Sequence, residues 1–114
     1  MRNSRYNKLI ERLLQATSEG KLHWDASSQA NEYQVSVGEN LVLISGPRRS
    51  LGFNVNLDME NMSIALVNSD GIEIDRQKVE LSDSAYEKFL ELFDMARKNY
   101  YKVDETLQEV IDEV

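Results

Sequence analysis

The sequence of 114 residues contains no cysteine, so it cannot form a disulfide, a thiolate zinc site or a cysteine nucleophile. The one histidine, His23, is the only imidazole available to a Ser-His-Asp triad, and no Gly-x-Ser-x-Gly motif accompanies it. Glycine-rich phosphate-binding loops and acidic loops with calcium-binding spacing are also absent. We therefore expect no catalytic, cofactor-binding or metal-binding residues, and no enzymatic activity.

Long hydrophobic runs are missing as well. Residues 1–5 lead into an amphipathic helix rather than into the apolar core of a signal peptide. No run of apolar residues is long enough to span a membrane. We therefore expect a soluble cytoplasmic protein that does not bind a membrane.

Basic residues are few relative to acidic ones, and the formal net charge is −7. Residues 1–31 carry a net charge of +2, whereas residues 32–81 carry −4 and residues 82–114 carry −5. An acidic surface repels the phosphates of nucleic acids, so direct binding to DNA or RNA is not expected. A charge of this size keeps a protein in solution, and it also suits a basic protein partner.

The N-terminal part of the chain has the pattern of an amphipathic helix over residues 4–19. Its apolar side chains recur at helical spacing, at Tyr6, Leu9, Ile10, Leu13 and Leu14. Gly20 follows at the position where a left-handed C-terminal cap is expected. Residues 25–31 have no large apolar side chain and are predicted to form a loop.

From Glu32 onward, apolar and polar residues alternate with a period of two, which is typical of β-strands. Five strands are predicted, with a bulge or a strand end near Arg76, over residues 33–37, 41–44, 53–59, 62–67 and 72–81. The strand at 41–44 is apolar on both faces, which predicts a central position in the sheet. The short turns between strands imply an antiparallel meander.

These elements predict an α+β fold in a single domain that spans residues 1–114. The expected order is an N-terminal helix, a five-stranded antiparallel β-meander and a long C-terminal helix. Both helices should pack on one face of the sheet. That face should carry the apolar residues Phe53, Val55, Leu57, Ile64 and Leu66.

The C-terminal segment, residues 84–114, has the longest helical pattern of the chain. Its apolar residues alternate three and four positions apart, at Tyr86, Phe89, Phe93, Ala96, Tyr100, Val103, Leu107, Val110 and Val114. Such a helix would be about 45 Å long, whereas a domain of this size is about 30 Å across. We therefore expect either a break within residues 99–102 or a helical extension at 100–114 that projects and binds a partner.

Two groups of residues are candidates for binding that partner. One is the narrow apolar stripe at the end of the helix, together with a tyrosine that lies off the stripe: Tyr101, Val103, Leu107, Val110 and Val114. The other is the only adjacent basic pair, Arg48 and Arg49, which could bind carboxylates of a partner. The stripe predicts a homodimer through the C-terminal helix or, alternatively, a partner with a basic groove.

Two further features have both a structural and a functional interpretation. Trp24 is expected to fill the edge of the core, and alternatively to contact a ligand or partner. The carboxylate pairs Asp58 with Glu60 and Glu73 with Asp75 are two residues apart, so the members of each pair are predicted to share a face. Their polar neighbours favour solvated surface groups over the two carboxylates of a hydrolase.

The segment 17–24 contains a Gly-Lys-x-x-Trp sequence, Gly20-Lys21-Leu22-His23-Trp24, after the first helix and before a strand that begins with tyrosine. In this it resembles small uncharacterised bacterial proteins with the same signature. The resemblance covers about the first 45 residues and implies a bacterial or phage origin, with no functional residue to transfer. The acidic charge, size and helix–sheet–helix order also resemble type III secretion chaperones. Those proteins place a helix between the third and fourth strands, where this chain has only Glu60-Asn61.

The sequence thus favours a non-enzymatic acidic protein-binding module of the inhibitor, immunity or chaperone type. This interpretation depends on the missing catalytic groups, the net charge of −7 and a helix too long for its domain. The alternative is a small-ligand-binding or regulatory domain with a pocket between Trp24 and the sheet.

Overall fold

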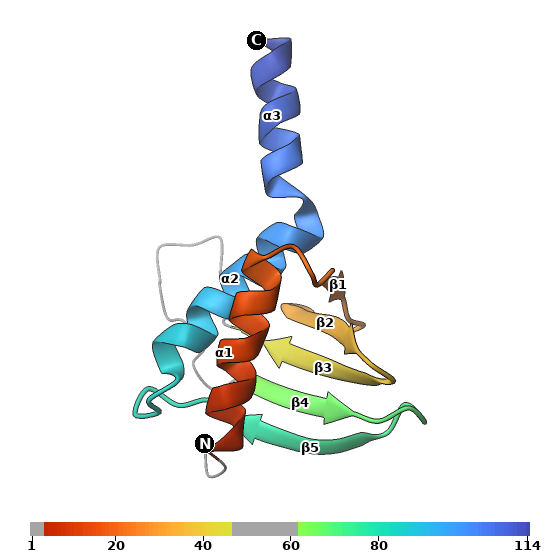
Figure 1. Ribbon diagram of the computed structural model, residues 1–114, viewed down its shortest axis with the longest axis vertical. Helices are drawn as coiled ribbons and strands as arrows, with labels where there is room; N and C mark the ends of the chain where they lie inside the picture. The colour runs from red at the N-terminus through yellow and green to blue at the C-terminus, as the bar shows by residue number, and fades with distance from the viewer. Residues whose placement is uncertain (1–3, 47–61) are drawn as a thin grey trace.

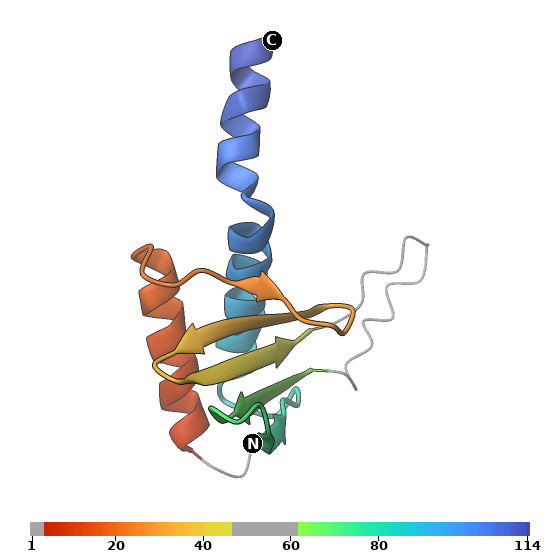
Figure 2. The same cartoon turned by 90° about the vertical axis from the view of Figure 1, so that its right-hand side faces the viewer.

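The computed structural model describes residues 4–46 and 62–114, and these residues form an antiparallel sheet covered by helices (Figures 1 and 2). In chain order the elements are α1 (Arg5–Ser18), β1 (Asp25–Ala26), β2 (Glu32–Val37), β3 (Asn40–Ser45), β4 (Ser63–Val67), β5 (Glu73–Lys78), α2 (Tyr86–Tyr101) and α3 (Val103–Glu113). The strands lie side by side in the order β1-β2-β3-β4-β5, and each neighbouring pair is antiparallel. The predicted α+β meander is therefore confirmed.

The strands of the sheet differ in part from those that the sequence predicts. β1 comes from the segment that was expected to be a loop, and it pairs Asp25 with Gln34 and Ala26 with Tyr33. Both residues of β1 are exposed and show no alternation of apolar and polar side chains. Their strand conformation therefore depends on pairing with the edge of β2. The predicted strand 53–59, including Phe53, Val55 and Leu57, lies outside the described residues.

One face of the sheet packs against α1 and α2 and forms the core. Directly opposite residues of three strands, Tyr33, Ile44 and Ile64, lie in one row on this face. Each helix contributes apolar residues at helical spacing, as predicted for a helix that covers a sheet. The buried helical residues are Tyr6, Ile10, Leu13 and Thr17 of α1 and Phe89, Leu92, Phe93 and Ala96 of α2. β3 pairs with both β2 and β4, so its predicted central position is confirmed.

Trp24 is buried in this core, as the structural interpretation predicted. Its exposed fraction is 2%, and its indole N–H donates a hydrogen bond of 3.0 Å to the hydroxyl of Thr17 on α1. The backbone N–H of Trp24 donates to the side-chain oxygen of Asn99 at 2.7 Å. The segment after α1 is thereby tied both to α1 and to the last turns of α2.

The β4–β5 pairing contains the irregularity predicted near Arg76. Leu66 is opposite Asp75 and Val67 is opposite Glu73, so the intervening Ile74 is an extra residue in β5. Because the bulge changes the alternation, Glu73 and Asp75 do not share a face. Glu73 contacts Arg76, whereas Asp75 accepts a hydrogen bond from Tyr6 of α1. The expectation that this pair lies on one face was wrong, because a strict period of two does not hold across a bulge.

The hydrogen bond between Tyr6 and Asp75 joins α1 to the last strand. The Tyr6 hydroxyl donates to Asp75 Oδ2 at 2.5 Å. Burial, followed by the hydrogen bond to Asp75, raises the pKa of Tyr6 to about 12. The same hydrogen bond, followed by one from Gln77, holds the pKa of Asp75 below its usual range.

Tyr6→Phe is expected to lower the free energy of unfolding at neutral pH, because the variant loses this hydrogen bond. The pKa of this carboxyl is lower in the folded chain than in the unfolded chain, where it is about 3.9. The ionised carboxylate therefore stabilises the fold at any pH above the unfolded-state pKa, and this contribution is lost as the pH falls through the folded-state pKa. The difference between variant and wild type should therefore be present at pH 7 and shrink in acid. Urea unfolding at several pH values measures it, and a difference that persists unchanged in acid would assign the loss to packing instead.

Candidate protein-docking surface

The predicted long C-terminal helix is interrupted at Lys102, which separates α2 from α3. Lys102 has φ 53° and ψ 49°, in the left-handed region that residues with a Cβ occupy at a cost of about 1–2 kcal/mol. The backbone N–H of Lys102 donates to the carbonyl of Asn99, and Thr106 N–H donates to the carbonyl of Lys102. The predicted break within residues 99–102 is therefore confirmed, and the segment after it also projects from the sheet and the other helices (Figures 1 and 2).

The end of α2 is held in place by aromatic contacts with the sheet. The ring of Tyr33 on β2 lies 5.4 Å from that of Phe93 and 5.8 Å from that of Tyr100, measured between centroids. Burial, and then the nearby hydroxyl of Tyr101, raises the pKa of Tyr33. These contacts position α2 up to Tyr100, and no ring contact of this kind joins α3 to the described part of the sheet.

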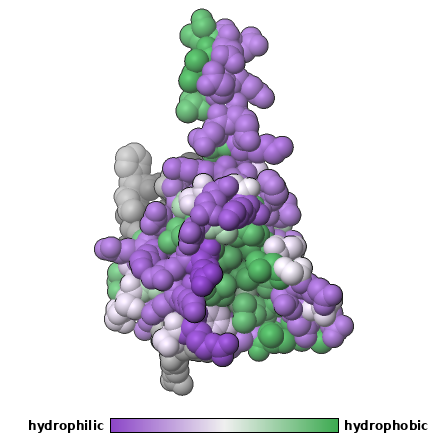
Figure 3. Space-filling model, in the orientation of Figure 1, coloured by the Kyte–Doolittle hydropathy of each residue, from purple (hydrophilic) through white to green (hydrophobic). Residues whose placement is uncertain are grey.

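α3 exposes an apolar stripe and has no buried residue. Leu107, Val110 and Ile111 are 55%, 53% and 57% exposed, and Val114 beyond the helix is fully exposed. Figure 3 shows these apolar side chains gathered along one side of the projecting helix, with hydrophilic residues over the rest of its visible surface. Apolar residues at this i, i+3, i+4, i+7 spacing are typical of helices that dock into a groove.

The charged residues of α3 are all acidic. Asp104, Glu105, Glu109, Asp112 and Glu113 give the helix a net charge of −5. At 100° per residue, Asp104 and Glu113 border the apolar stripe, and the other three carboxylates lie on the opposite side. Carboxylates in the first turn interact favourably with the helix dipole, whereas no basic residue follows in the last turn. A partner surface with basic groups beside an apolar strip would complement this helix.

The structure brings together most of the residues that the sequence proposed for partner binding. Leu107, Val110 and Val114 are exposed on the stripe, and Val103 is partly buried at the N-terminal end of α3. Tyr101 is 59% exposed and contacts the ring of Tyr100. Arg48 and Arg49 lie outside the described residues, so their role stays a prediction.

A second surface feature, which the sequence did not indicate, is a groove beside α1. It has a volume of about 350 Å³ and lies between α1 from Leu9 onward, the segment that follows α1 and the end of β2. Its lining residues are Leu9, Arg12, Leu13, Gln15, Ala16, Glu19, Lys21, Leu22 and Val37. In Figure 3 the apolar part of this region is seen beside α1, over the sheet. The groove does not include Trp24, where the sequence placed a possible ligand pocket.

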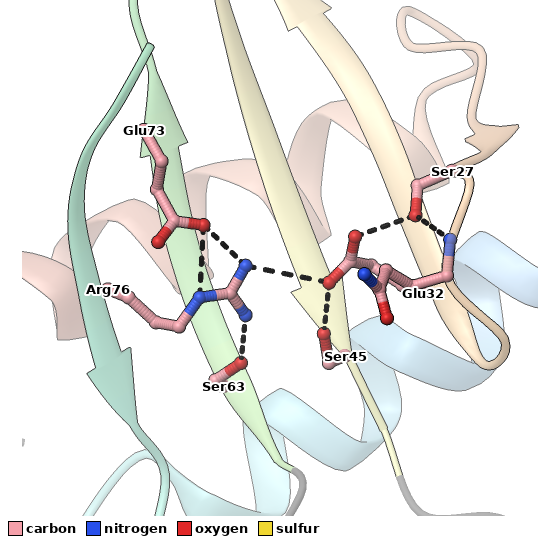
Figure 4. A network of polar contacts seen from close by, with 7 residues as sticks. Ser27, Glu32, Ser45, Ser63, Glu73 and Arg76 are labelled. Carbon is pink, nitrogen blue, oxygen red and sulfur yellow. Dashed lines mark hydrogen bonds and ion pairs between the residues drawn. The ribbon is translucent and has the colours of Figure 1, made fainter.

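The opposite face of the sheet carries a polar network around Glu32, a buried carboxylate of β2 (Figure 4). The hydroxyls of Ser27 and Ser45 each donate to Glu32 at 2.6 Å, and the Arg76 guanidinium lies 3.6 Å from it. Arg76 also donates to Ser63 at 2.7 Å and to Glu73. Since hydroxyl and guanidinium groups occupy both oxygens of Glu32, this network joins the strands rather than presenting a free carboxylate.

The remaining histidine and acidic side chains that the structure describes do not form a metal-binding cluster. His23 is exposed. In residues 4–46 and 62–114, no three or more histidine or acidic side chains are placed to hold a metal ion. Nor does this described part of the chain contain a helix whose length and apolarity would allow it to cross a membrane.

Comparisons of the chain with protein-family models, with curated proteins and with solved structures give no match. The surfaces that bear on function are the exposed stripe of α3 and the groove beside α1, with the charges around them.

Proposed function

We propose that the protein is a non-enzymatic acidic protein-binding module that binds through α3, and that its first partner is a second copy of the chain. The observation that carries this proposal is the apolar stripe of α3, none of which is buried. Isolated helices of fewer than about 12–15 residues are marginal in water, and α3 has 11 residues. Contact with another protein surface would stabilise α3, which buries none of its residues against its own domain.

The position of the break supports a docking role for α3. The contacts of Tyr33 and Asn99 fix the end of α2, so α3 leaves the body from a defined point. Its apolar stripe is bordered by carboxylates, which would add charge-assisted contacts where a partner supplies basic groups. We therefore place the chain among acidic protein-binding modules of the inhibitor, immunity or chaperone type.

Sedimentation equilibrium is the experiment that tests the proposal. The full chain is expected to have the mass of a dimer at micromolar concentration and to approach that of a monomer on dilution. A chain that remains monomeric throughout the micromolar range, at moderate salt and neutral pH, would contradict self-association through α3.

A further inference from the structure

We infer that α3 of one chain docks into the groove beside α1 of a second copy, and that the second copy does the same in return. This inference rests on the proposed self-association and names the surface that receives α3. It differs from a coiled coil, in which the two α3 helices would bury their stripes only against each other.

The groove offers the apolar surface that the stripe needs. Leu9 and Leu22 contribute aliphatic side chains from α1 and the segment after it, and Val37 contributes one from the end of β2, whereas Leu13 is already buried beneath them. Val37 is 42% exposed, and Leu9 and Leu22 are partly buried. A helix that presents Leu107, Val110 and Ile111 in adjacent turns would cover these side chains and bury its own.

The charges of the two surfaces are complementary. Residues 1–31, which include α1, carry a net charge of +2, whereas α3 carries −5. Arg12 and Lys21 line the groove, and Arg12 makes no ion pair with any residue of the described chain. Lys21 contacts Glu19 at 2.7 Å, and its side chain remains 71% exposed. Docking would bring Asp104 and Glu113, which border the stripe, close to these basic groups.

The size of the contact favours a reciprocal arrangement. Each α3 has 11 residues and is about 16 Å long. If the two α3 helices paired only with each other, the dimer interface would be limited to one contact of this length. Stable interfaces bury roughly 1,200–2,000 Å². α3 leaves the body at the end of the molecule where α1 also ends (Figures 1 and 2). A twofold-related copy can therefore place each α3 over the groove of the other, which gives two equivalent contacts and a closed dimer.

Engineered thiols test this arrangement, because the chain has no cysteine that could form competing disulfides. One chain carries Gln15→Cys in the groove, and a second, with a cleavable tag to distinguish its mass, carries Gln108→Cys beside the stripe of α3. The two are mixed in equal amounts at micromolar concentration and oxidised in a glutathione buffer. The matched control replaces the groove variant with Gln29→Cys, an exposed position that does not line the groove.

The expected product is the mixed disulfide between the Gln15→Cys and Gln108→Cys chains, at several times the yield of the Gln29→Cys control. A Gln108→Cys chain that links mainly to itself would overturn the groove and assign α3 to a helix pair, leaving the proposed self-association intact. A chain that is dimeric in sedimentation but gives no mixed disulfide above the control would also overturn the groove as the site that receives α3. A monomer in sedimentation would overturn the inference and the proposed function together.

Discussion

Phe89→Ala should destabilise the fold by about 3–5 kcal/mol, as truncation of a fully buried phenylalanine does. Phe89 is completely buried, and it joins α2 to the core that includes Ile10 of α1 and Ile64 of β4. Removing its ring would leave a cavity that these neighbours can fill only in part. The midpoint of guanidinium unfolding, followed by circular dichroism, measures the change.

Glu91→Ala is the matched control for Phe89→Ala, because Glu91 is exposed on the same helix. Its effect should be under about 0.5 kcal/mol. Equal losses for the two variants would contradict the assignment of the buried face of α2.

Leu107→Asp should leave the stability of the monomer nearly unchanged and weaken self-association by more than about a hundredfold, which corresponds to about 2.7 kcal/mol. Leu107 is more than half exposed on α3, so its replacement removes no buried contact of the single chain. In the dimer, both copies would lose a buried leucine, each worth about 1.5–3 kcal/mol, and would bury a carboxylate. Sedimentation equilibrium measures the dissociation constant.

The control for Leu107→Asp is Gln108→Glu, which adds the same charge one position away without removing an apolar side chain. It should change the dissociation constant only a few-fold. If Leu107→Asp dimerises as the wild type does, the stripe is not the interface. If it instead unfolds the chain, α3 packs on its own domain.

Local sequence patterns predicted much of the fold. α1 follows from its helical spacing and from Gly20, which adopts φ +73° immediately beyond the helix. β2 and β4 follow from their alternation, and β3 follows from a short run that is apolar on both faces. β1 could not be predicted, because its two polar residues become a strand only by pairing with β2.

The exact point at which the C-terminal helix breaks also has no local signal. Lysine is a good helix former, so the residue type at position 102 does not indicate that the helix breaks there. The break comes directly after residues that tertiary contacts hold, because Asn99 accepts a hydrogen bond from Trp24 and Tyr100 lies against Tyr33. The stripe on α3 was predictable because its spacing is local, and its projection was one of the two alternatives that the length of the helical pattern predicted.

The groove and the network around Glu32 could not be predicted because they depend on tertiary structure. The groove combines residues of α1 with Val37, which is distant in sequence. The network needs the register that places Glu32 opposite Ser45 and Ser45 opposite Ser63. Without that register, Arg76 and Glu32 are only two charged residues far apart in the chain.

The central claim is that α3 buries its apolar stripe against another protein molecule, and hydrogen exchange of residues 103–114 as a function of concentration tests it most directly. The account predicts fast exchange at concentrations far below the dissociation constant, where α3 has no partner, and slow exchange far above it. Slow exchange at every concentration would mean that α3 packs on its own chain. Fast exchange at every concentration, up to the highest that can be reached, would mean that α3 does not dock on a second copy at all.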